Sequence, residues 1–399
     1  MPFLKSAVLL LLAAPIFGSD GTPSEPAGVR VHEWGTFTSV AGENGAPEAW
    51  TPLAEPSDLP CFVYHLAQKC IKCAPGFEPK SLPTVPTSTV RMETPVLYFY
   101  SAQPATVSVR VDFPRGWITE WYPQASKVLP QILEGQPMPA LGGGHIEWNH
   151  VAISPATQSA APVGQGSSRY YVARHTDAQP ISVSGQAEKL IFYRGIADFP
   201  VPLSVKVLDA SRLEIADTGN AVLPLVILFE NRGGNLGYRA IREFSGTQVV
   251  NTPGFSGDQD GLKTHLAAAL TDLGLYPQEA AAMIATWSDS WFEDGMRVFY
   301  LMPQRQVDAV LPIAIQPAPA ETRRVFVGRV EVLSPFVRQT LTTALSTGDV
   351  KILAKYGRFL EPFATRIQGA ETASPATAAF FRSRQEEARH EYEAPSCIR

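Results

Sequence analysis

Residues 29–40 combine ionisable, aromatic and β-branched side chains, and they form the first segment with groups that could carry chemistry. Read as a strand, the segment places Glu33 on its more apolar face and His32 on the other face. A carboxylate on an apolar face must find a cationic or hydrogen-bonding partner or give up its charge. A structural Arg–Glu pair is the interpretation that we favour over a functional carboxylate. The first partners to consider are Arg91, Arg194 and Arg297.

A wider group of candidate catalytic residues lies at the ends of expected strands or at junctions between elements, where distant parts of a chain can converge. Glycoside hydrolases use two carboxyl groups about 5 to 9.5 Å apart as acid and base or nucleophile, and Glu residues of this group could act in that way. A network of buried Arg–Glu pairs leaves the same pattern in a sequence, and we favour that alternative. The candidates are His32, Glu33, Arg91, Glu93, Arg194 and Glu293.

Tryptophan residues supply a separate set of candidate ligand contacts. Such side chains could line a surface for a small molecule, a glycan or a protein segment, although tryptophan more often completes a core or a domain interface. The candidates are Trp34, Trp117, Trp121 and Trp291.

Neither a metal nor a cofactor is predicted. His145 and Glu147 would point the same way on a strand, whereas His150 would point the opposite way, so the three do not form a metal shell. The chain has no phosphate-binding loop, dinucleotide fingerprint or nucleophile elbow.

The four cysteines are Cys61, Cys70, Cys73 and Cys397. With His65, the first three could supply a tetrahedral zinc shell. Thiols of exported proteins oxidise, so disulfides are favoured over zinc, and three connectivities stay open. One attractive arrangement joins the carboxyl-terminal tail to the body of the protein and closes the loop between residues 61 and 73.

The amino-terminal region has the pattern of a secretory signal peptide, with Lys5 followed by an apolar run over residues 7–17 and then small and polar residues. The run is too short to span a bilayer, and no later stretch reaches that length. We therefore expect a signal peptide over residues 1–18, a linker over 19–28, and a secreted or periplasmic protein without a transmembrane segment after signal removal.

The composition indicates a globular protein that does not bind nucleic acid. The chain has 399 residues, of which 45% are hydrophobic and 18% are charged. Its 33 basic residues are balanced by 38 acidic ones and form no basic stripe. The 35 prolines fit many strand ends and disfavour a mainly helical protein.

Hydrophobic alternation predicts an α+β fold. Short strands with turn signals, of which residues 106–113 alternate most clearly, indicate a β-rich, sandwich-like domain over 29–250. Amphipathic helices beginning near Asp260 and Pro277, further strands and short helices then indicate a smaller mixed α+β domain over 251–370. A helical tail is expected over 371–399.

Residues 32–38, His-Glu-Trp-Gly-Thr-Phe-Thr, together with residues 190–195 and 325–333, resemble a group of uncharacterised exported bacterial proteins that open with the same seven residues. The resemblance covers most of the chain after the leader. It implies an exported bacterial protein and carries no known activity.

Two functions are compatible with these observations, and the sequence leaves open whether the protein is an enzyme. The first is a non-catalytic exported binding or envelope-associated protein, suggested by the β-rich frame, the aromatic residues and the lack of a catalytic signature. The alternative is a hydrolase of extracellular or cell-envelope polymers that uses Glu33, Glu93 or Glu293 as acid and base.

Overall fold

The computed structural model describes residues 28–54, 58–66, 86–131, 139–154, 161–164, 168–368, 374–393 and residue 397. The predicted signal peptide, nearly all of the predicted linker, and Cys70 and Cys73 lie outside the described residues.

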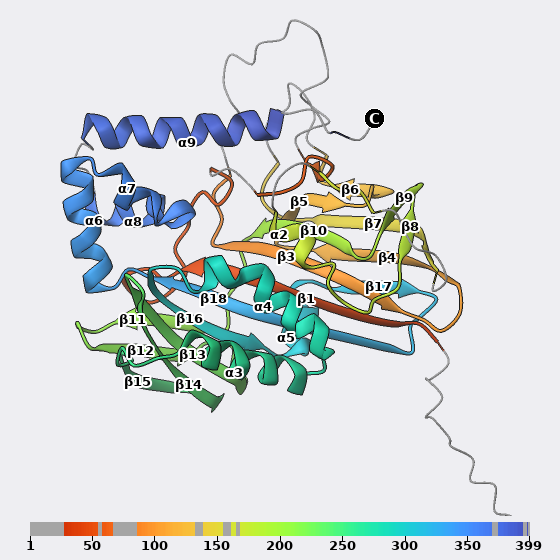
Figure 1. The fold of residues 1–399 in the computed structure, drawn as a ribbon, viewed down its shortest axis with the longest axis horizontal. Helices are drawn as coiled ribbons and strands as arrows, with labels where there is room; N and C mark the ends of the chain where they lie inside the picture. Colours follow the sequence, from red (N-terminus) through yellow and green to blue (C-terminus); the bar gives the residue numbers. More distant parts are fainter. Residues whose placement is uncertain are drawn as a thin grey trace, which may run out of the picture.

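A large twisted sheet runs through the middle of the molecule, with strand β1 (Arg30–Val40) at its centre (Figure 1). β1 pairs in parallel with β18 on one side and antiparallel with β3 on the other. Every residue from Val31 to Val40 is buried, because both faces of the sheet are covered. The sheet order is β14 (Asn235–Phe244), β13 (Leu223–Arg232), β16 (Gly295–Met302), β18 (Glu321–Val332), β1, β3 (Val90–Tyr100), β10 (Ile191–Ala197), β5 (Gly116–Tyr122) and β2 (Tyr64–His65).

Two smaller sheets cover one face of the central sheet and make the fold sandwich-like. The core between the sheets contains Val107, Val109 and Val111, the inward members of the alternating strand that the sequence identifies, together with Val31 and Phe37 of β1. One small sheet consists of β17 (Ile313–Gln316), β4 (Ala105–Phe113), β7 (Gly144–Ile153), β8 (Ile181–Val183) and β9 (Gln186–Glu188), with β6 (Lys127–Leu129) paired to β7. The other consists of β11 (Leu203–Val207), β12 (Arg212–Asp217) and β15 (Thr247–Asn251).

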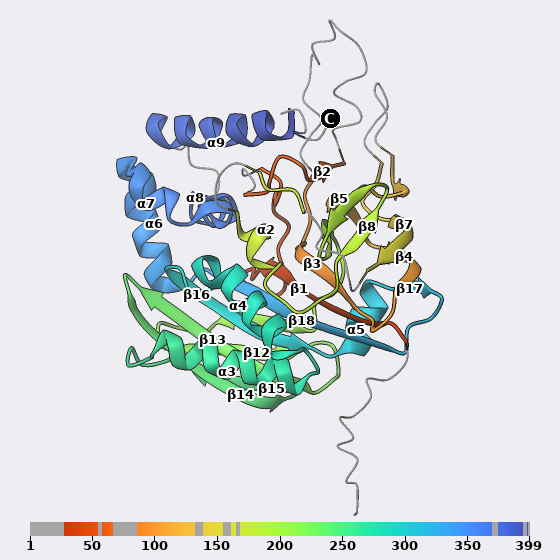
Figure 2. The same cartoon turned by 45° about the vertical axis from the view of Figure 1, so that its right-hand side comes forward.

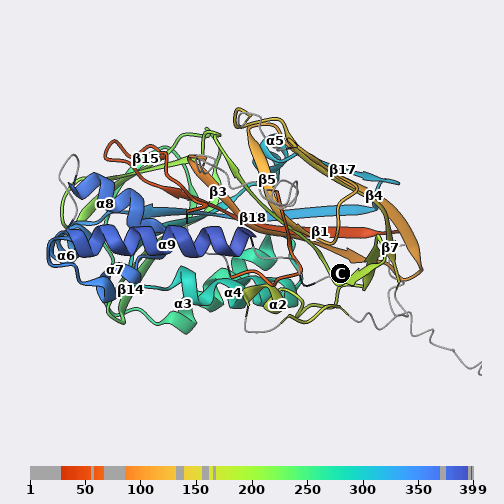
Figure 3. The same cartoon turned by 90° about the horizontal axis from the view of Figure 1, so that it is seen from above.

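Helices cover the opposite face, as the view from above shows (Figure 3). Asp258 caps α3 (Gln259–Asp272) by accepting hydrogen bonds from two backbone N–H groups, and Pro277 opens α4 (Pro277–Trp291). The short α2 (Arg169–Val172) contacts α4 on the same face. α5 (Gln304–Val310) packs against β18 on the other face, where Val307 joins the core between the sheets.

The carboxyl-terminal helices form a third core at one end of the central sheet, where they enclose Val40 and Trp50 (Figures 1 and 2). Ser334 caps the first of them through its hydroxyl, and Gly348 ends it in the left-handed region at φ 71°. These elements are α6 (Pro335–Thr347), α7 (Val350–Ala354), η1 (Gly357–Phe359), α8 (Leu360–Gln368) and α9 (Pro375–Glu393).

The predicted fold class, a β-rich sandwich-like part with carboxyl-terminal helices, is confirmed. The predicted boundary at residue 250 does not separate two bodies, since β16 and β18 come after it and lie between β13 and β1 in one sheet. Alternation identifies a strand from local sequence, whereas the partner of that strand depends on long-range packing. Among the described residues, no helix is both long and apolar enough to cross a membrane.

A disulfide joins Cys61 to Cys397 across 336 residues and ties the end of the chain to the body, as predicted for the tail. Because this bridge uses Cys61, the predicted closure of the loop between residues 61 and 73 by a second bridge from Cys61 is wrong. Among the described side chains of α9, Thr377 and Ala388 are buried, so this helix makes few core contacts of its own.

Removing this disulfide is expected to release α9 locally and leave the rest of the fold intact. We expect trypsin to cut within residues 374–393 of the Cys61→Ser/Cys397→Ser double variant on the order of tenfold faster than in the wild type, which corresponds to about 1.4 kcal/mol of local stability. Mass spectrometry of timed digests measures the rate, and cleavage sites in the central sheet serve as the internal control. Equal cleavage rates within α9 would contradict the tethering role.

Candidate functional site

Charged side chains cross the helix-bearing face of the central sheet in a row. Val90 and Met92 point into the core between the sheets, so Arg91 and Glu93 point to the opposite face. The strand register brings Arg329 of β18 into the same row, because Thr38 of β1 lies opposite Arg91 on one side and opposite Arg329 on the other. Further charged or ionisable residues of the row lie opposite each other on neighbouring strands, in the pairs Arg297–Glu331, Arg194–Glu120 and His65–Glu120.

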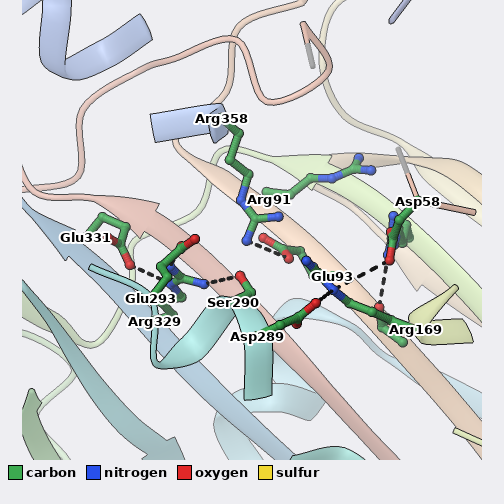
Figure 4. Close-up of polar contacts among 12 residues, drawn as sticks. Asp58, Arg91, Glu93, Arg169, Asp289, Ser290, Glu293, Arg329, Glu331 and Arg358 are labelled. Atoms are coloured by element: carbon green, nitrogen blue, oxygen red, sulfur yellow. Dashed lines mark hydrogen bonds and ion pairs between the residues drawn. The ribbon is translucent and has the colours of Figure 1, made fainter. Parts of the chain in front are cut away.

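A cavity of about 200 Å³ opens where this row meets the carboxyl-terminal helices. Four of the candidate catalytic residues line it, namely Arg91, Glu93, Arg194 and Glu293. Figure 4 shows how side chains from β3, α4 and η1 converge there. The other described lining residues are Pro52, Asp58, Arg169, Ser290, Tyr356, Gly357, Arg358, Phe359 and Arg384.

The described lining of the cavity is rich in arginine: it contains five arginines and three carboxylates, an excess of two positive charges among the lining residues, of which Arg91 is also paired with Glu120 outside the lining. Each carboxylate is held by an arginine. Glu93 lies 3.0 Å from Arg358, and Glu293 accepts a hydrogen bond of 2.8 Å from Arg329. Low local dielectric strengthens the field of the excess charge, so the cavity attracts anions.

Asp58 is the third carboxylate, and it pairs with Arg194 at 3.3 Å and with Arg169 at 3.6 Å. Burial by itself would raise the pKa of Asp58, but attraction to these two guanidinium groups outweighs burial and lowers the pKa below its ordinary value. Asp58 is therefore an ionised hydrogen-bond acceptor at neutral pH and not a proton donor.

Several polar atoms of the cavity lining are buried without a hydrogen-bond partner among the described residues. They include Nε of Arg194, Nε of Arg358 and Oε1 of Glu93. Arg194 and Glu93 are only 8% and 2% exposed, so water is largely excluded from them. An unsatisfied buried polar group costs about 1–3 kcal/mol, and a bound ligand that satisfies these groups would recover part of that cost.

A network beneath the cavity fixes Ser290 and Glu293 in place. Arg329 donates to Glu331 at 2.5 Å, to the Ser290 hydroxyl at 2.8 Å and to Glu293. Arg297 donates to Glu331 at 2.8 Å and to three backbone carbonyl groups at the end of α4. Because these groups hold one another, the cavity lining is organised before any ligand arrives.

Arg91 is held in the same way on the β5 side of the cavity. Its guanidinium donates to both oxygens of Glu120, at 2.9 and 3.1 Å, and to the Thr119 hydroxyl. Burial would raise the pKa of Glu120, but attraction to Arg91, His65 and Arg194 outweighs it and lowers the pKa to about 2. Burial lowers the pKa of His65, and repulsion by Arg194 and Arg91 lowers it further. Attraction to Glu120 acts in the opposite direction but is outweighed, so His65 is neutral at neutral pH.

His32 and Glu33 do not belong to the cavity. His32 Nδ1 lies 2.8 Å from Glu279, among the aromatic rings of Tyr100 and Tyr276. Glu33 lies on the opposite face, where Arg324 Nε donates to it at 2.5 Å and the Tyr193 hydroxyl donates to its other oxygen.

The three partners first considered for Glu33 are therefore corrected to Arg324, which lies opposite Glu33 in the parallel β1–β18 register. That register joins segments 291 residues apart and has no local signature in the sequence.

The candidate tryptophans lie in the core and not on a surface. Trp34, Trp117 and Trp291 are 0–1% exposed and Trp121 is 7% exposed. Trp34 and Trp291 belong to the core under the helices, and Trp121 belongs to the core between the sheets. Their apolar area completes these cores, which corrects the expectation that they line a ligand surface.

Sequence reasoning missed several lining residues, of which Asp58, Arg169, Arg358 and Arg384 are charged. Each lies in a loop, a short helix or the carboxyl-terminal helix, and no spacing links them to β3. Among the described residues, no group of three His, Cys, Asp or Glu side chains is placed to hold a metal ion.

No protein-family model matches the chain, and no curated protein matches its sequence. Among solved structures, the chain is similar to the yeast delta-COP-I mu-homology domain complexed with a Dsl1 WxWxV peptide, at 7% sequence identity and a TM-score of 0.29. The similarity covers 76% of this chain and 98% of that chain. At this TM-score it supports no inference about function.

Proposed function

We propose that this protein is a non-catalytic exported binding protein that holds an anionic ligand in the arginine-lined cavity. The observation that carries the proposal is the set of five arginines around one cavity, with buried Nε atoms of Arg194 and Arg358 that lack a partner among the described residues. Guanidinium groups match carboxylate and phosphate oxygens in geometry and charge. Export rests on the amino-terminal pattern and the resemblance of residues 32–38.

The state of the carboxylates supports binding over hydrolysis. A glycosidase needs one carboxyl group that carries a proton at working pH beside a second one that is ionised. Glu93, Glu293 and Asp58 each pair with an arginine, and the pKa of Asp58 is lowered by its two arginines, so the described lining offers no carboxyl group in an apolar setting that would hold a proton. Glu33, the remaining candidate of the hydrolase hypothesis, lies on the other face of the sheet.

Arg194→Gln is expected to weaken anion binding by about 10- to 100-fold, because a hydrogen bond to a charged group contributes about 1.5–3 kcal/mol. Isothermal titration calorimetry with inorganic phosphate and with glucuronate measures the affinity of the purified chain. Binding should also weaken as sodium chloride is raised, since the attraction is electrostatic.

The matched control is Arg338→Gln. Arg338 is a half-exposed arginine that lines a different cavity and pairs with Glu43 at 3.4 Å. Its replacement should leave the affinity unchanged. Failure of both anions to bind, or equal affinities for the Arg194→Gln variant and the wild type, would refute the proposed function.

A further inference from the structure

The arginine-lined cavity also contains a buried acceptor that an anion alone would leave unsatisfied. Glu93 is 2% exposed and its Oε1 lacks a hydrogen-bond donor among the described residues, while its Oε2 lies 3.0 Å from Arg358. A ligand that brought only negative charge would leave Oε1 without a donor and add repulsion between like charges. The lining therefore calls for a ligand with two kinds of groups.

The missing donor must be neutral. Arg358 already compensates the charge of Glu93, and the lining as a whole has an excess of positive charge. An ammonium group placed beside Glu93 would meet the repulsion of Arg358, whereas a hydroxyl group donates a hydrogen bond without adding charge. Ionised Asp58, which lines the same cavity, is a second acceptor for a hydroxyl.

The two aromatic residues of the described lining, Tyr356 and Phe359, are only 7% and 3% exposed and offer little stacking surface. The ring of Phe359 is also covered by Arg329 at 4.8 Å and Arg358 at 4.9 Å. Binding energy must then come from charge and hydrogen bonds. The volume of about 200 Å³ lies below the roughly 300–1,000 Å³ of cavities for drug-sized ligands, which favours a ligand of one small ring.

We propose that the ligand is an anionic monosaccharide, whose carboxylate or phosphate group faces Arg194 and Arg358 and whose hydroxyl groups donate to Glu93 and Asp58. This inference rests on the proposed anion-binding function and specifies its ligand class. Carboxylated and phosphorylated sugars share the required chemistry, and the experiment below distinguishes them.

The test compares ligands that differ in one property on the wild-type chain by isothermal titration calorimetry. Glucuronate has the anion and the hydroxyl groups, cyclohexanecarboxylate has the anion on a similar ring without hydroxyl groups, and glucose has hydroxyl groups without the anion. We expect glucuronate to bind at least about tenfold more tightly than cyclohexanecarboxylate, because its hydroxyl hydrogen bonds should contribute about 1.4 kcal/mol. Glucose, which lacks the anion, should bind more weakly than either acid. Glucose 6-phosphate, compared with cyclohexylmethyl phosphate, which has the phosphate on a similar ring without ring hydroxyl groups, tests the phosphorylated class in the same way.

The outcomes separate this inference from the proposed function. If the acids bind but neither sugar acid binds more tightly than its analogue without ring hydroxyl groups, the assignment of a monosaccharide ligand is refuted and the anion-binding function stands. If no anion binds, or glucose binds as tightly as glucuronate, the anion-binding function itself fails.

The variant Glu93→Gln gives a second readout, because it removes the charged acceptor while it keeps the size of the side chain. We expect it to lose about tenfold in its preference for glucuronate over cyclohexanecarboxylate, without weakening cyclohexanecarboxylate binding. The control is Glu43→Gln, an exposed acid outside this cavity, which should keep the wild-type preference. A folded Glu93→Gln variant that keeps the wild-type preference for glucuronate would overturn the role of Glu93. If that variant does not fold, the ligand comparison on the wild-type chain still decides the ligand class.

Discussion

Replacing Arg324 by methionine is expected to lower the free energy of unfolding by about 3–5 kcal/mol, because the Glu33 carboxylate would then be buried without its cation. Both side chains are fully buried, and Arg324 donates to Glu33 at 2.5 Å and to the Leu311 carbonyl at 2.6 Å. The Tyr193 hydroxyl cannot replace the lost charge. The midpoint and slope of urea unfolding measure the change.

Two further variants test the cause of this loss. The double variant Glu33→Gln/Arg324→Met should recover most of the stability, since it removes both charges and keeps an acceptor for Tyr193. Arg323→Met changes the neighbouring arginine, which is half-exposed and pairs with Glu321 at 2.6 Å, and it should cost at most about 1 kcal/mol. A single Arg324→Met variant as stable as Arg323→Met would contradict the proposed role of the buried pair.

The second large effect is a loss of stability at low pH. Glu120 is fully buried, and a folded-state pKa of about 2 in place of the ordinary 4.5 corresponds to about 3 kcal/mol of stability. Because the folded state lowers this pKa, the contribution is complete above pH 4.5 and is lost as the pH falls from 4.5 towards 2. The free energy of unfolding, measured by urea titration at a series of pH values, should decline over that interval.

The comparison variant is Glu120→Gln, which has no proton to take up. It should be less stable than the wild type at pH 7, because Arg91 loses its carboxylate, and the difference between the two proteins should shrink by about 3 kcal/mol as the pH falls to 2. Other carboxylates titrate equally in both proteins and cancel in the difference. A difference that stays constant between pH 4.5 and 2 would show that Glu120 is not the responsible group.

These two sites explain how the central sheet tolerates so many charges. Glu33 and Arg324 form an ion pair on one face, whereas Arg91, Glu93 and Arg194 belong to a row on the other face that ends in a cavity. The first arrangement serves stability. In the second, Arg194 and Glu93 line a cavity with buried polar atoms that lack a hydrogen-bond partner among the described residues, whereas Arg324, whose Nη2 also lacks one, does not line that cavity; we therefore assign function to the cavity and not to Glu33.

The amino-acid sequence predicts the fold class, many of the strands and part of the site. Alternation in residues 106–113 predicted a half-buried strand, and Val107, Val109 and Val111 are buried there. Charged residues at strand ends and junctions are visible in the local sequence, which makes Arg91, Glu93, Arg194 and Glu293 candidates, and these four residues line one cavity.

What the sequence could not supply was the identity of partners. The parallel pairing of β1 with β18 places Arg324 opposite Glu33, and the packing of η1 on the sheet brings Arg358 to Glu93. Cys61 likewise meets Cys397 across 336 residues. Periodicity and turn residues are local properties that a short window reveals. Many registers and strand partners are compatible with the same alternation, so pairing across hundreds of residues depends on how whole layers pack. For this reason the site is visible only in the folded chain.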